Sequence, residues 1–561
     1  MLIEKIRKVS PSRMQKFWFS GIWVSAPLGA LVVAAYLYIA RTFQDLGIYV
    51  FTTDFPIIII LFSSVVLLFF LRNLKRRIID QQTDFRPSFQ RPSVTDLSED
   101  KIKAQNKPVP EKFCSMEPDG LTVGKRNGRY VRIPFMDSPE HQLIYGAPGT
   151  KKSNVIKNAL LRIFNYESTV SSVLAIDCKP ELSRECVYEG RGDIKVINPS
   201  ATDRYGFDVY FGLSQESTDD DLKERFAMVS RTLIVNSSEE NAFFYVSAQN
   251  ILTAFLMYGF RKGYSFGEAV LTVMDASTED LISELLNDPE MESHPKIRRL
   301  VRAFDGKDSD AFQDIAMTLQ QDLSIFDVDT VQRCFASANP KKASPIDLAN
   351  GISIFIAIPD DQLKLYSPVF RLITQLCLHY MMGLPEWTRR EKNPTWFLID
   401  EAGSIGPIPD LLEALARGRS KKIQLSLVCQ SYAQLEQTYG RDGAITISDC
   451  VKTTVVLSCN NTTTAKSLSD RTGTYRETKV STHKNVAALM SGASSTNESE
   501  EYRPVMDVAD ITALERDEKV LVFAKGDWFL VDKAPYYTIR EHKELSDRII
   551  KENQKFYSDP V

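Results

Sequence analysis

The segment Trp396–Glu401 constrains the fold of this chain more than any other, because an apolar run, Trp-Phe-Leu-Ile, leads directly into two carboxylates. A short, continuous apolar run is typical of a strand that is buried on both faces of a parallel sheet. The acids, Asp400 and Glu401, then fall at the carboxyl end of that strand, where open α/β sheets bind their ligands. The segment therefore predicts an α/β sheet with a ligand site at this edge, although a buried strand followed by an acidic helix cap would also fit.

A second motif lies far upstream and has the order strand, glycine loop, helix. His141–Tyr145 precedes the loop, and a helical pattern runs from Asn154 to Phe164 after it. In a phosphate-binding loop, successive backbone N–H groups and the helix N-terminus face the β and γ phosphates. Lys152 would add a positive charge, and Ser153 would supply a hydroxyl ligand for Mg²⁺. The candidate loop consists of Gly146, Ala147, Pro148, Gly149, Thr150, Lys151, Lys152 and Ser153.

One residue of this loop departs from the strict phosphate-loop pattern, which has glycine immediately before the Lys-Ser pair. This chain has Lys151 there. A side chain at that point could crowd the approach of the backbone to phosphate, or it could point outward and add positive charge if φ is negative. The intact spacing, the preceding strand and the acid pair favour nucleotide binding. A degenerate, inactive loop is the alternative.

Taken together, the two motifs predict an NTPase. In this interpretation Asp400 holds Mg²⁺ through water, and Glu401 orients or deprotonates the attacking water. The eight cysteines and five histidines are dispersed without CxxC or metal-ligand spacing, so a zinc enzyme has little support. The cysteines instead indicate reduced thiols in the core.

Two N-terminal stretches, Phe17–Ala40 and Phe55–Leu71, carry no charge and have about the length needed to cross roughly 30 Å of hydrocarbon. We expect both to be transmembrane helices, although a cleaved signal peptide is an alternative for the first. Basic residues precede the first stretch and follow the second, whereas the connecting loop holds only Arg41 against Asp45 and Asp54. This distribution of positive charge predicts that both termini are cytoplasmic. The basic flanks are Lys5, Arg7, Lys8, Arg13 and Lys16, then Arg72, Lys75, Arg76 and Arg77.

Charge and composition limit the remaining possibilities. The chain has 561 residues, of which 43% are hydrophobic and 25% charged, which is ample for two or three domains with proper cores and excludes a disordered chain. Residues 1–80 hold ten Lys and Arg against four Asp and Glu, a net charge of +6. Because the whole chain has a net charge of −4, residues 81–561 carry −4 − 6 = −10. Any contact with nucleic acid must therefore be local.

The body of the chain alternates short apolar runs with helical periodicity, which predicts a largely parallel α/β sheet. Asp84–Lys112 is polar and proline-bearing and predicts a linker to this body. The segment Lys519–Asp532, with a turn at Lys525–Asp527, predicts a β-hairpin. The candidate strands of the sheet are residues 141–145, Ser172–Asp177, Ile194–Ile197, Ile352–Ile358, 396–400, Gln424–Cys429 and Thr453–Ser458.

One region interrupts this alternation. Between about Gly212 and Ala343 the sequence offers only helical runs, which predicts an all-helical domain inserted into the sheet domain. Arg476–Tyr502 is rich in Ser, Thr and Asn and predicts a flexible excursion. The expected domains are a membrane anchor at 1–80, a P-loop NTPase domain at 81–211 and 344–545, the helical insertion at 212–343 and a C-terminal tail at 546–561.

The order of these features resembles the coupling proteins of type IV secretion, which are inner-membrane DNA-pumping ATPases of bacterial conjugation. Four segments carry the resemblance, and in the first of them Pro180 replaces a glycine of the family pattern. The segments are Leu174–Leu182; Ile352–Pro359 with Ser367–Ile373; Leu415–Lys421 with Val428–Ser431, Leu435 and Tyr439–Gly440; and Lys533–Tyr537.

The resemblance implies a RecA-like P-loop NTPase domain that uses ATP and Mg²⁺, and roles for two further residues. It implies that Gln430 senses the γ phosphate, and an uncharged amide can hydrogen-bond both phosphate and water. A glutamine that only caps a strand is the alternative. Arg419 is a candidate for a charge that reaches the nucleotide, across a subunit boundary if need be. A solvated helix-end arginine fits equally well. A basic cluster that could meet a DNA backbone comprises Arg417, Lys421, Lys422 and Arg441.

The leading hypothesis is a multi-pass inner-membrane coupling protein, a homo-hexameric ATP-driven DNA translocase. The resemblance implies the ring and its partners: DNA bound without sequence specificity, a relaxase with accessory relaxosome proteins, and components of the secretion channel. One alternative is an inactive membrane docking receptor in which Lys151 has disabled the loop. Another is a secretion ATPase that does not act on DNA. Cargo recognition near the C-terminus would fall to the helix-like stretch Arg540–Lys555.

Overall fold

The computed structural model describes residues 99–135, 140–150, 152–166, 170–201, 204–235, 242–304, 309–389, 392–483 and 495–556, together with Arg41. The two expected membrane spans and Lys151 lie outside these residues. No helix among the described residues has both the length and the apolar character needed to cross a bilayer. The chain divides into two units, Met1–Arg91 and Pro92–Val561, and the description below concerns the second.

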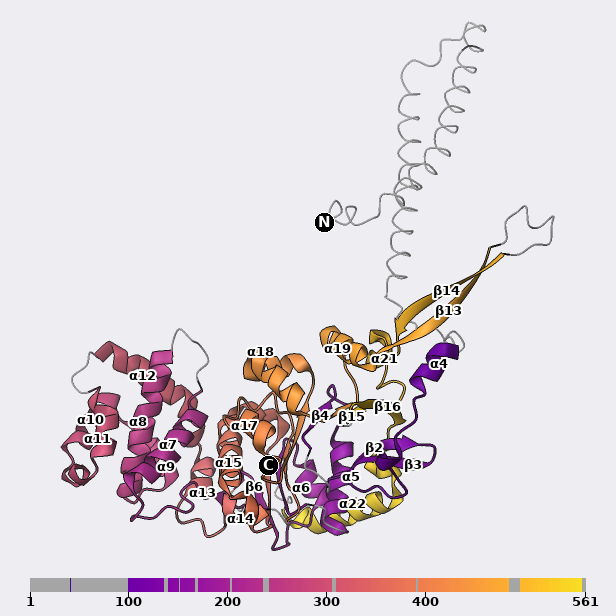
Figure 1. The fold of residues 1–561 in the computed structure, drawn as a ribbon. Coiled ribbons are helices and arrows are strands. Elements are labelled where there is room, and N and C mark those ends of the chain that lie inside the picture. Colours follow the sequence, from indigo (N-terminus) through magenta and orange to yellow (C-terminus); the bar gives the residue numbers. More distant parts are fainter. Residues whose placement is uncertain are drawn as a thin grey trace. The chain divides into compact units, whose positions relative to one another are not determined.

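A twelve-stranded sheet organises the described part of this unit, and its central strands are all parallel (Figure 1). The predicted strands occur at the expected places, with ends that differ by no more than two residues. Almost every residue in them is buried, as a sheet covered on both faces requires. In spatial order the parallel strands are β12 (Thr453–Val456), β4 (Gln142–Tyr145), β11 (Ile423–Cys429), β10 (Thr395–Ile399), β5 (Ser172–Asp177), β9 (Ser353–Ala357) and β6 (Ile194–Ile197).

The sheet continues beyond β12 with antiparallel strands, so it is mixed rather than purely parallel. The predicted hairpin is confirmed as β15 (Lys519–Ala524) and β16 (Asp527–Asp532). Its two turn residues, Lys525 and Gly526, have φ of 53° and 84°, the left-handed conformation that favours a tight hairpin. Beyond β16 the sheet ends with β2 (Leu121–Arg126), β3 (Arg129–Ile133) and β1 (Cys114–Ser115).

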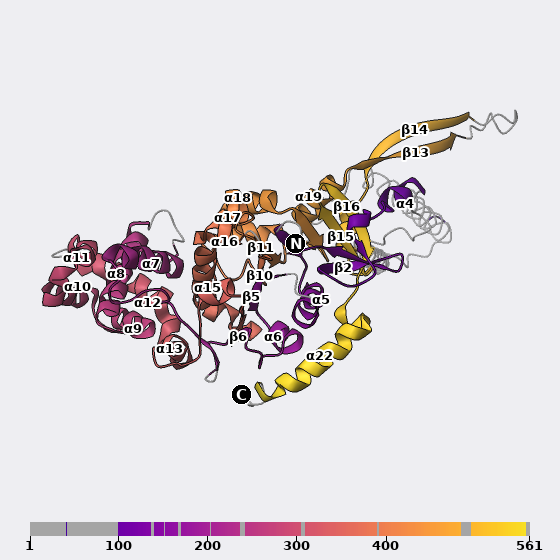
Figure 2. The same cartoon turned by 60° about the horizontal axis from the view of Figure 1, so that its bottom comes forward.

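Helices cover both faces of the parallel strands, and alternate residues of each strand supply the two cores. Phe397 and Ile399 of β10 belong to one core, and Trp396 and Leu398 belong to the other. The first core includes α15 (Leu363–Gly383), α17 (Leu411–Arg417) and α18 (Tyr432–Cys450). The second includes α5 (Lys152–Asn165), α6 (Glu181–Cys186) and α22 (Arg540–Asn553), which lie together on the other side of the sheet (Figure 2).

Between two short strands, β7 (Gly206–Phe207) and β8 (Lys342–Ala343), the described residues form seven α-helices. Most of them are grouped at the left of Figure 1. These two strands pair in parallel, which brings the ends of the helical region together. Capping boxes at Thr218 and Ser265 define the first turns of two of the helices. The boundaries of the predicted inserted domain, 212 and 343, stay a prediction. The helices are α7 (Asp219–Leu233), α8 (Ala242–Arg261), α9 (Phe266–Asp275), α10 (Thr278–Asn287), α11 (Pro295–Arg302), α12 (Ser309–Leu323) and α13 (Asp329–Phe335).

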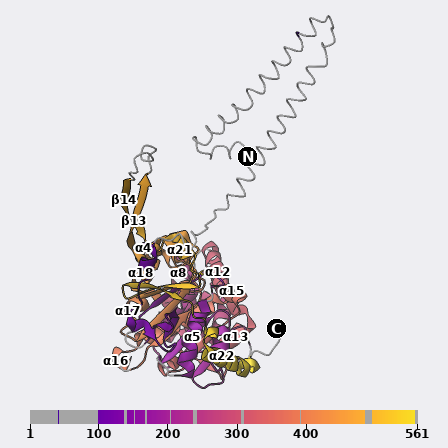
Figure 3. The same ribbon diagram turned by 90° about the vertical axis from the view of Figure 1, so that its right-hand side faces the viewer.

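The prediction that Arg476–Tyr502 forms a flexible excursion was wrong for the described parts of this segment. These parts form a hairpin of β13 (Thr474–His483) and β14 (Ser495–Pro504), paired from Thr474↔Pro504 to His483↔Ser495. Figures 1 and 3 show it projecting beyond α19 (Thr462–Thr472) and α21 (Val508–Thr512). A hairpin outside the main sheet needs no apolar face, so its polar composition concealed it. Cross-strand ion pairs at its base, including Arg503 with Glu477 at 2.8 Å, stabilise the pairing instead.

The predicted C-terminal helix is confirmed as α22, which is anchored to the phosphate-loop helix α5 through a buried polar contact. Asn158 Nδ2 donates to the carbonyl of Ala534 at 2.9 Å, which leaves Asn158 Oδ1 to accept from His542 Nδ1, 2.8 Å away. His542 is only 1% exposed, and its Nε2 has no partner among the described residues. Burial, with a smaller effect of Arg162, lowers the pKa of His542 to about 4. The imidazole is therefore neutral in the folded protein.

Acid should destabilise this packing. Between pH 6.5 and about 4 the unfolded chain binds a proton at His542 that the folded chain does not, so stability is full above this window and falls as pH drops through it. We expect a loss of about 2 kcal/mol at pH 5 from this group, absent in His542→Gln. Denaturation curves at pH 7.5, 6 and 5 measure it. His379→Gln is the control of opposite sign, because the hydrogen bond that His379 donates to the carboxylate of Asp410 raises the pKa of His379. Identical pH dependence of His542→Gln and the unmodified protein would contradict the assignment.

Candidate functional site

The candidate phosphate loop connects β4 to α5 and is tied to both neighbouring strands. Gly146 N–H donates to the carbonyl of Cys429 at 3.1 Å, at the end of β11. Ala147 N–H donates to Ser458 Oγ at 2.7 Å, just beyond β12. Within the loop, Thr150 Oγ1 donates to the carbonyl of Ala147 at 2.7 Å. The described part of the loop is thus a defined turn at the carboxyl edge of the sheet, and α5 begins at Lys152, two residues before the predicted start at Asn154.

Two glycines of this loop are required for different reasons. A Cβ on Gly146 would lie 2.6 Å from Lys152 Cγ and 2.7 Å from Thr150 Oγ1, so only glycine lets the chain pass. Gly149 has open space around it but a φ of +83°, a conformation that side chains disfavour. The conformation of Lys151 lies outside the described residues.

The sheet register brings the acid pair to this loop. Strand β11 lies between β4 and β10 and pairs in parallel with both, so the three carboxyl ends meet at one edge. Glu401 follows β10 in the left-handed conformation, with φ of 54°, and the N–H of Ala402 donates to the carbonyl of Val428 at 2.8 Å. This unusual backbone turns the chain sharply after Asp400.

Lys152, Glu401 and Gln430 come together at this edge. Lys152 Nζ lies 2.7 Å from Glu401 Oε1, and Gln430 Nε2 donates to Glu401 Oε2 at 3.2 Å. The side chains of Lys152 and Glu401 are only 10% and 17% exposed, so the ion pair is shielded from water. Glu401 therefore holds the phosphate-loop lysine and the predicted sensor glutamine at the same time.

Asp400 is next to this group in an environment suited to a divalent cation. Burial, and then the neighbouring Glu401, raise the pKa of Asp400 to about 7, whereas Lys152 acts in the opposite direction. A cation beside Asp400 would relieve both effects. No group of three or more His, Cys, Asp or Glu that could hold a metal occurs among the described residues. A single carboxylate with the Ser153 hydroxyl fits Mg²⁺, which keeps several waters and takes few protein ligands.

Further residues that the sequence did not single out hold the acid loop, which we define as Asp400–Asp410. Gln434 accepts from the N–H of Gln430 at 3.0 Å and donates to Ser404 Oγ at 3.2 Å. Thr438 Oγ1 donates to the carbonyl of Gly403 at 2.8 Å. The four-residue spacing of Gln434 and Thr438 was the available signal, since residues so spaced on α18 share one side of the helix.

Asp177, at the end of β5, has a structural role. Its carboxylate accepts from the backbone N–H groups of Glu181, Leu182 and Ser183 at 2.8–3.1 Å and so caps α6. Asp177 belongs to the segment Leu174–Leu182, one of the four that carry the family resemblance, and its helix cap explains why this segment has an acid there.

Residues 92–558 match the model of a protein family described as "Type IV secretory system Conjugative DNA transfer". The chain belongs to this family. The resemblance that the sequence indicated is thereby confirmed. The coupling protein VirD4 of Bartonella quintana (strain Toulouse) is 24% identical over 347 residues, which are 60% of this chain and 53% of that protein. The conjugal transfer protein TraG of Rhizobium radiobacter is 25% identical over 309 residues, 52% of this chain and 45% of that protein. The chain thus spans about half the length of the curated relatives it matches.

Solved structures of the conjugative coupling protein TrwB share the fold. The unbound TrwBdeltaN70 has a TM-score of 0.57 at 18% identity, covering 77% of this chain and 91% of that one. TrwB in complex with a non-hydrolysable ATP analogue has the same score, covering 78% and 92%. This chain therefore has a TrwB-like α/β nucleotide-binding fold with a mixed sheet.

In this family member Arg419 does not lie near its own phosphate loop. It sits in the turn between α17 and β11, at the amino end of the strand whose carboxyl end leads to Gln430. The seven residues of β11 separate these edges by about 20 Å. Arg417 of the basic cluster pairs with Glu413 at 2.7 Å, and Lys421 donates to the carbonyl of Leu384 at 2.8 Å. Any role of Arg419 at a nucleotide would be at the site of another subunit.

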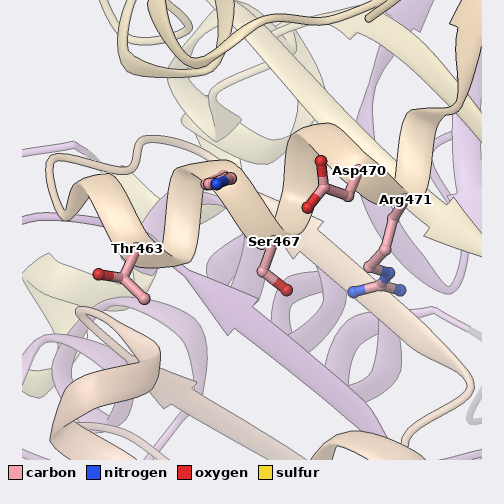
Figure 4. Close-up of a pocket in the computed structure, with 5 residues that line it drawn as sticks. Thr463, Ser467, Asp470 and Arg471 are labelled. Carbon is pink, nitrogen blue, oxygen red and sulfur yellow. The ribbon is translucent and has the colours of Figure 1, made fainter.

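Two hollows are lined by none of Lys152, Glu401 and Gln430. A shallow pocket of about 520 Å³ lies along one helix, α19, and contains none of the predicted site residues (Figure 4). A much smaller cavity lies directly behind the phosphate loop, where Thr150 and Asn154 meet Lys533–Pro535. The last of the four segments that carry the family resemblance, Lys533–Tyr537, thus lies next to the phosphate loop. The residues lining the pocket on α19 are Thr463, Lys466, Ser467, Asp470 and Arg471.

The phosphate loop can be tested with a matched pair of glycines. Gly149 and Gly128 both have positive φ, +83° and +78°, and a Cβ added to either would meet no atom within 4 Å. Each change to alanine should cost about 1 kcal/mol of stability. Only Gly149→Ala should also weaken binding of a fluorescent ATP analogue, by about tenfold or more, because the loop must shift to relieve the strain. Equal affinity in the two variants would exclude this loop as the phosphate site.

Proposed function

We propose that this chain is the ATP- and Mg²⁺-dependent motor of a conjugative type IV secretion system. It receives a relaxase-bound DNA substrate and drives the DNA into the secretion channel. The observation that carries the proposal is the convergence of Lys152, Glu401 and Gln430 on the carboxyl edge of the sheet in a member of the conjugative DNA-transfer family. One of the solved TrwB structures is a complex with ADP and Mg²⁺, which supports the same cofactors here.

Each residue of the site has a step to perform. The loop N–H groups and the N-terminus of α5 face the phosphates, and Lys152 exchanges Glu401 for phosphate oxygens when nucleotide binds. Ser153 and Asp400 would hold Mg²⁺, which would supply positive charge against the phosphates. Glu401, freed from Lys152, accepts a proton from or orients the attacking water. Gln430 hydrogen-bonds the γ phosphate and relays its loss to the acid loop, because its backbone and side chain contact Gln434 and Glu401.

The wider organisation is proposed with it. The motor is a RecA-like domain made of residues 81–211 and 344–545, with the helical insertion 212–343 and the tail 546–561. Residues 17–40 and 55–71 anchor it in the inner membrane as two spans, with both termini in the cytoplasm. Six copies form a ring around DNA, which they contact through its backbone, and relaxase, accessory relaxosome proteins and channel components are the partners.

ATP turnover by residues 84–561, with and without DNA, tests this function. The unmodified protein should hydrolyse ATP faster with DNA, and Lys152→Ala and Glu401→Gln should each lower turnover by about 100-fold or more. Lys152→Ala should also weaken nucleotide binding, whereas Glu401→Gln should bind ATP normally. Lys151→Gly is the control for the variant loop and should retain activity.

Two outcomes would replace the proposal. If the unmodified protein never turns over ATP, even in membranes with its partners, and Lys151→Gly restores hydrolysis, the chain is a docking receptor with a disabled loop. If turnover is robust but indifferent to DNA, the chain is a secretion ATPase of another kind.

A role of Arg419 at a neighbouring site predicts complementation between two inactive variants. Arg419→Ala keeps its own Glu401, and Glu401→Gln keeps its own Arg419, so a mixed ring contains some interfaces with both groups. An equimolar mixture should recover turnover at about a quarter of its interfaces, although each variant alone is inactive. The measurement is steady-state hydrolysis across a mixing series. A mixture no more active than its components would leave Arg419 as a solvated arginine.

A further inference from the structure

Arg371 is a buried arginine on α15 that contacts the inserted helices, not the phosphate loop. Its side chain is 8% exposed. Its Nε donates to the carbonyl of Thr232 at 2.7 Å, and its Nη2 donates to that of Leu233 at 3.1 Å. These carbonyls end α7, the first inserted helix, and a cation is favourable at a helix C-terminus. Burial lowers the pKa of Arg371, and Asp322 of α12 acts in the opposite direction.

The same guanidinium lies against the acid loop. A Cβ on Gly406 would be 2.7 Å from Arg371 Nη1, and Gly406 has a φ of +86°, so this position admits only glycine. One turn along α15, Gln375 Oε1 accepts from the N–H of Asp410 at 3.0 Å. Helix α15 thus holds the acid loop from one side, while Gln434 and Thr438 of α18 hold it from the other. In Figure 2, α15 lies between the sheet and the inserted helices.

We infer that Arg371 is a positioning residue that couples the acid loop to the C-terminal end of α7, so that the nucleotide state of the site and the placement of the inserted helices change together. This inference rests on the proposed nucleotide-dependent function and names how that site is linked to the helical region. The physical reason is that one rigid, planar group contacts both elements in a close-packed interior, where a shift of either cannot be absorbed by a void.

The linkage reaches Glu401 through short steps. Ser404 N–H donates to the carbonyl of Glu401 at 2.7 Å, and Gly406 follows Ser404 by two residues. When Lys152 exchanges Glu401 for phosphate, the acid loop loses one of its restraints and adopts a new position. Arg371 transmits this change, because it cannot follow Gly406 and keep both bonds to Thr232 and Leu233 unless α7 moves with it.

Arg371→Lys is the informative variant, since it keeps the charge but loses the planar fork. Arg225→Lys is the matched control. Arg225 Nη1 also donates to two backbone carbonyls, those of Val209 and Phe211 at 3.1 and 3.2 Å, and burial lowers its pKa to about 10. Among the residues that the structure describes, none of its hydrogen bonds involves the acid loop. Both changes should lower the melting temperature to a similar extent.

Two measurements on the full-length protein in detergent separate coupling from stability. The first is hydrogen–deuterium exchange of amides 230–235 with and without a non-hydrolysable ATP analogue. The analogue should alter exchange in the unmodified protein and in Arg225→Lys, but not in Arg371→Lys. The second is ATP turnover, where Arg371→Lys should keep analogue affinity within about threefold while kcat falls about tenfold or more, because the acid loop is misplaced.

Exchange that still responds to the analogue in Arg371→Lys overturns the inference, as does an equal fall of kcat in Arg371→Lys and Arg225→Lys. If the unmodified protein binds the analogue but does not hydrolyse ATP, the hydrolytic function fails while the exchange measurement still decides the coupling. If the unmodified protein binds no analogue, both fall, and this is visible before any variant is made.

Discussion

The parallel pairing of β4, β11 and β10 is the constraint on which the site depends. It sets three strand ends side by side, so that a glycine loop, a glutamine and an acid pair from distant parts of the sequence meet at one edge. A buried chain of hydrogen bonds crosses the same three strands: Trp396 Nε1 donates to Ser426 Oγ, which donates to Gln142 Oε1, at 2.8 and 2.7 Å. A slip of register would leave these polar groups unpaired in the core, which is costly.

Within that frame, Glu401 is the residue through which the parts of the site communicate. It holds Lys152 with one carboxylate oxygen and Gln430 with the other, and its own backbone begins the acid loop. The Lys152–Glu401 ion pair is shielded from water, so it opens readily only when another anion takes the place of Glu401. Breaking the pair without such a replacement leaves two buried charges unpaired. In the proposed function the replacing anion is phosphate. The helices that hold the acid loop, α15 and α18, are the elements next to such an exchange.

Much of the fold followed from local patterns. Each central strand was predicted because a strand that is buried on both faces appears in the sequence as a continuous apolar run. The phosphate loop and the acid pair were predicted because the residues of each are contiguous in the sequence. The β13–β14 hairpin was missed because a strand pair outside the main sheet carries no apolar signal. Asp177 caps helix α6, a role that its sequence context alone did not predict. The sequence showed Arg371 only as one residue of an apolar helix and predicted none of its contacts.

Sequence by itself predicted most of the strands and helices around the site, a phosphate loop with an acid pair, and the family to which the chain belongs, since these depend on neighbours in the chain. Tertiary structure alone decided that β11 lies between β4 and β10, that Glu401 bridges Lys152 and Gln430, and that Arg419 lies at the far edge from its own phosphate loop. It also decided that Arg371 contacts both α7 and Gly406. These facts depend on the order of strands in the sheet and on side-chain packing between segments far apart in sequence, and no local periodicity encodes either.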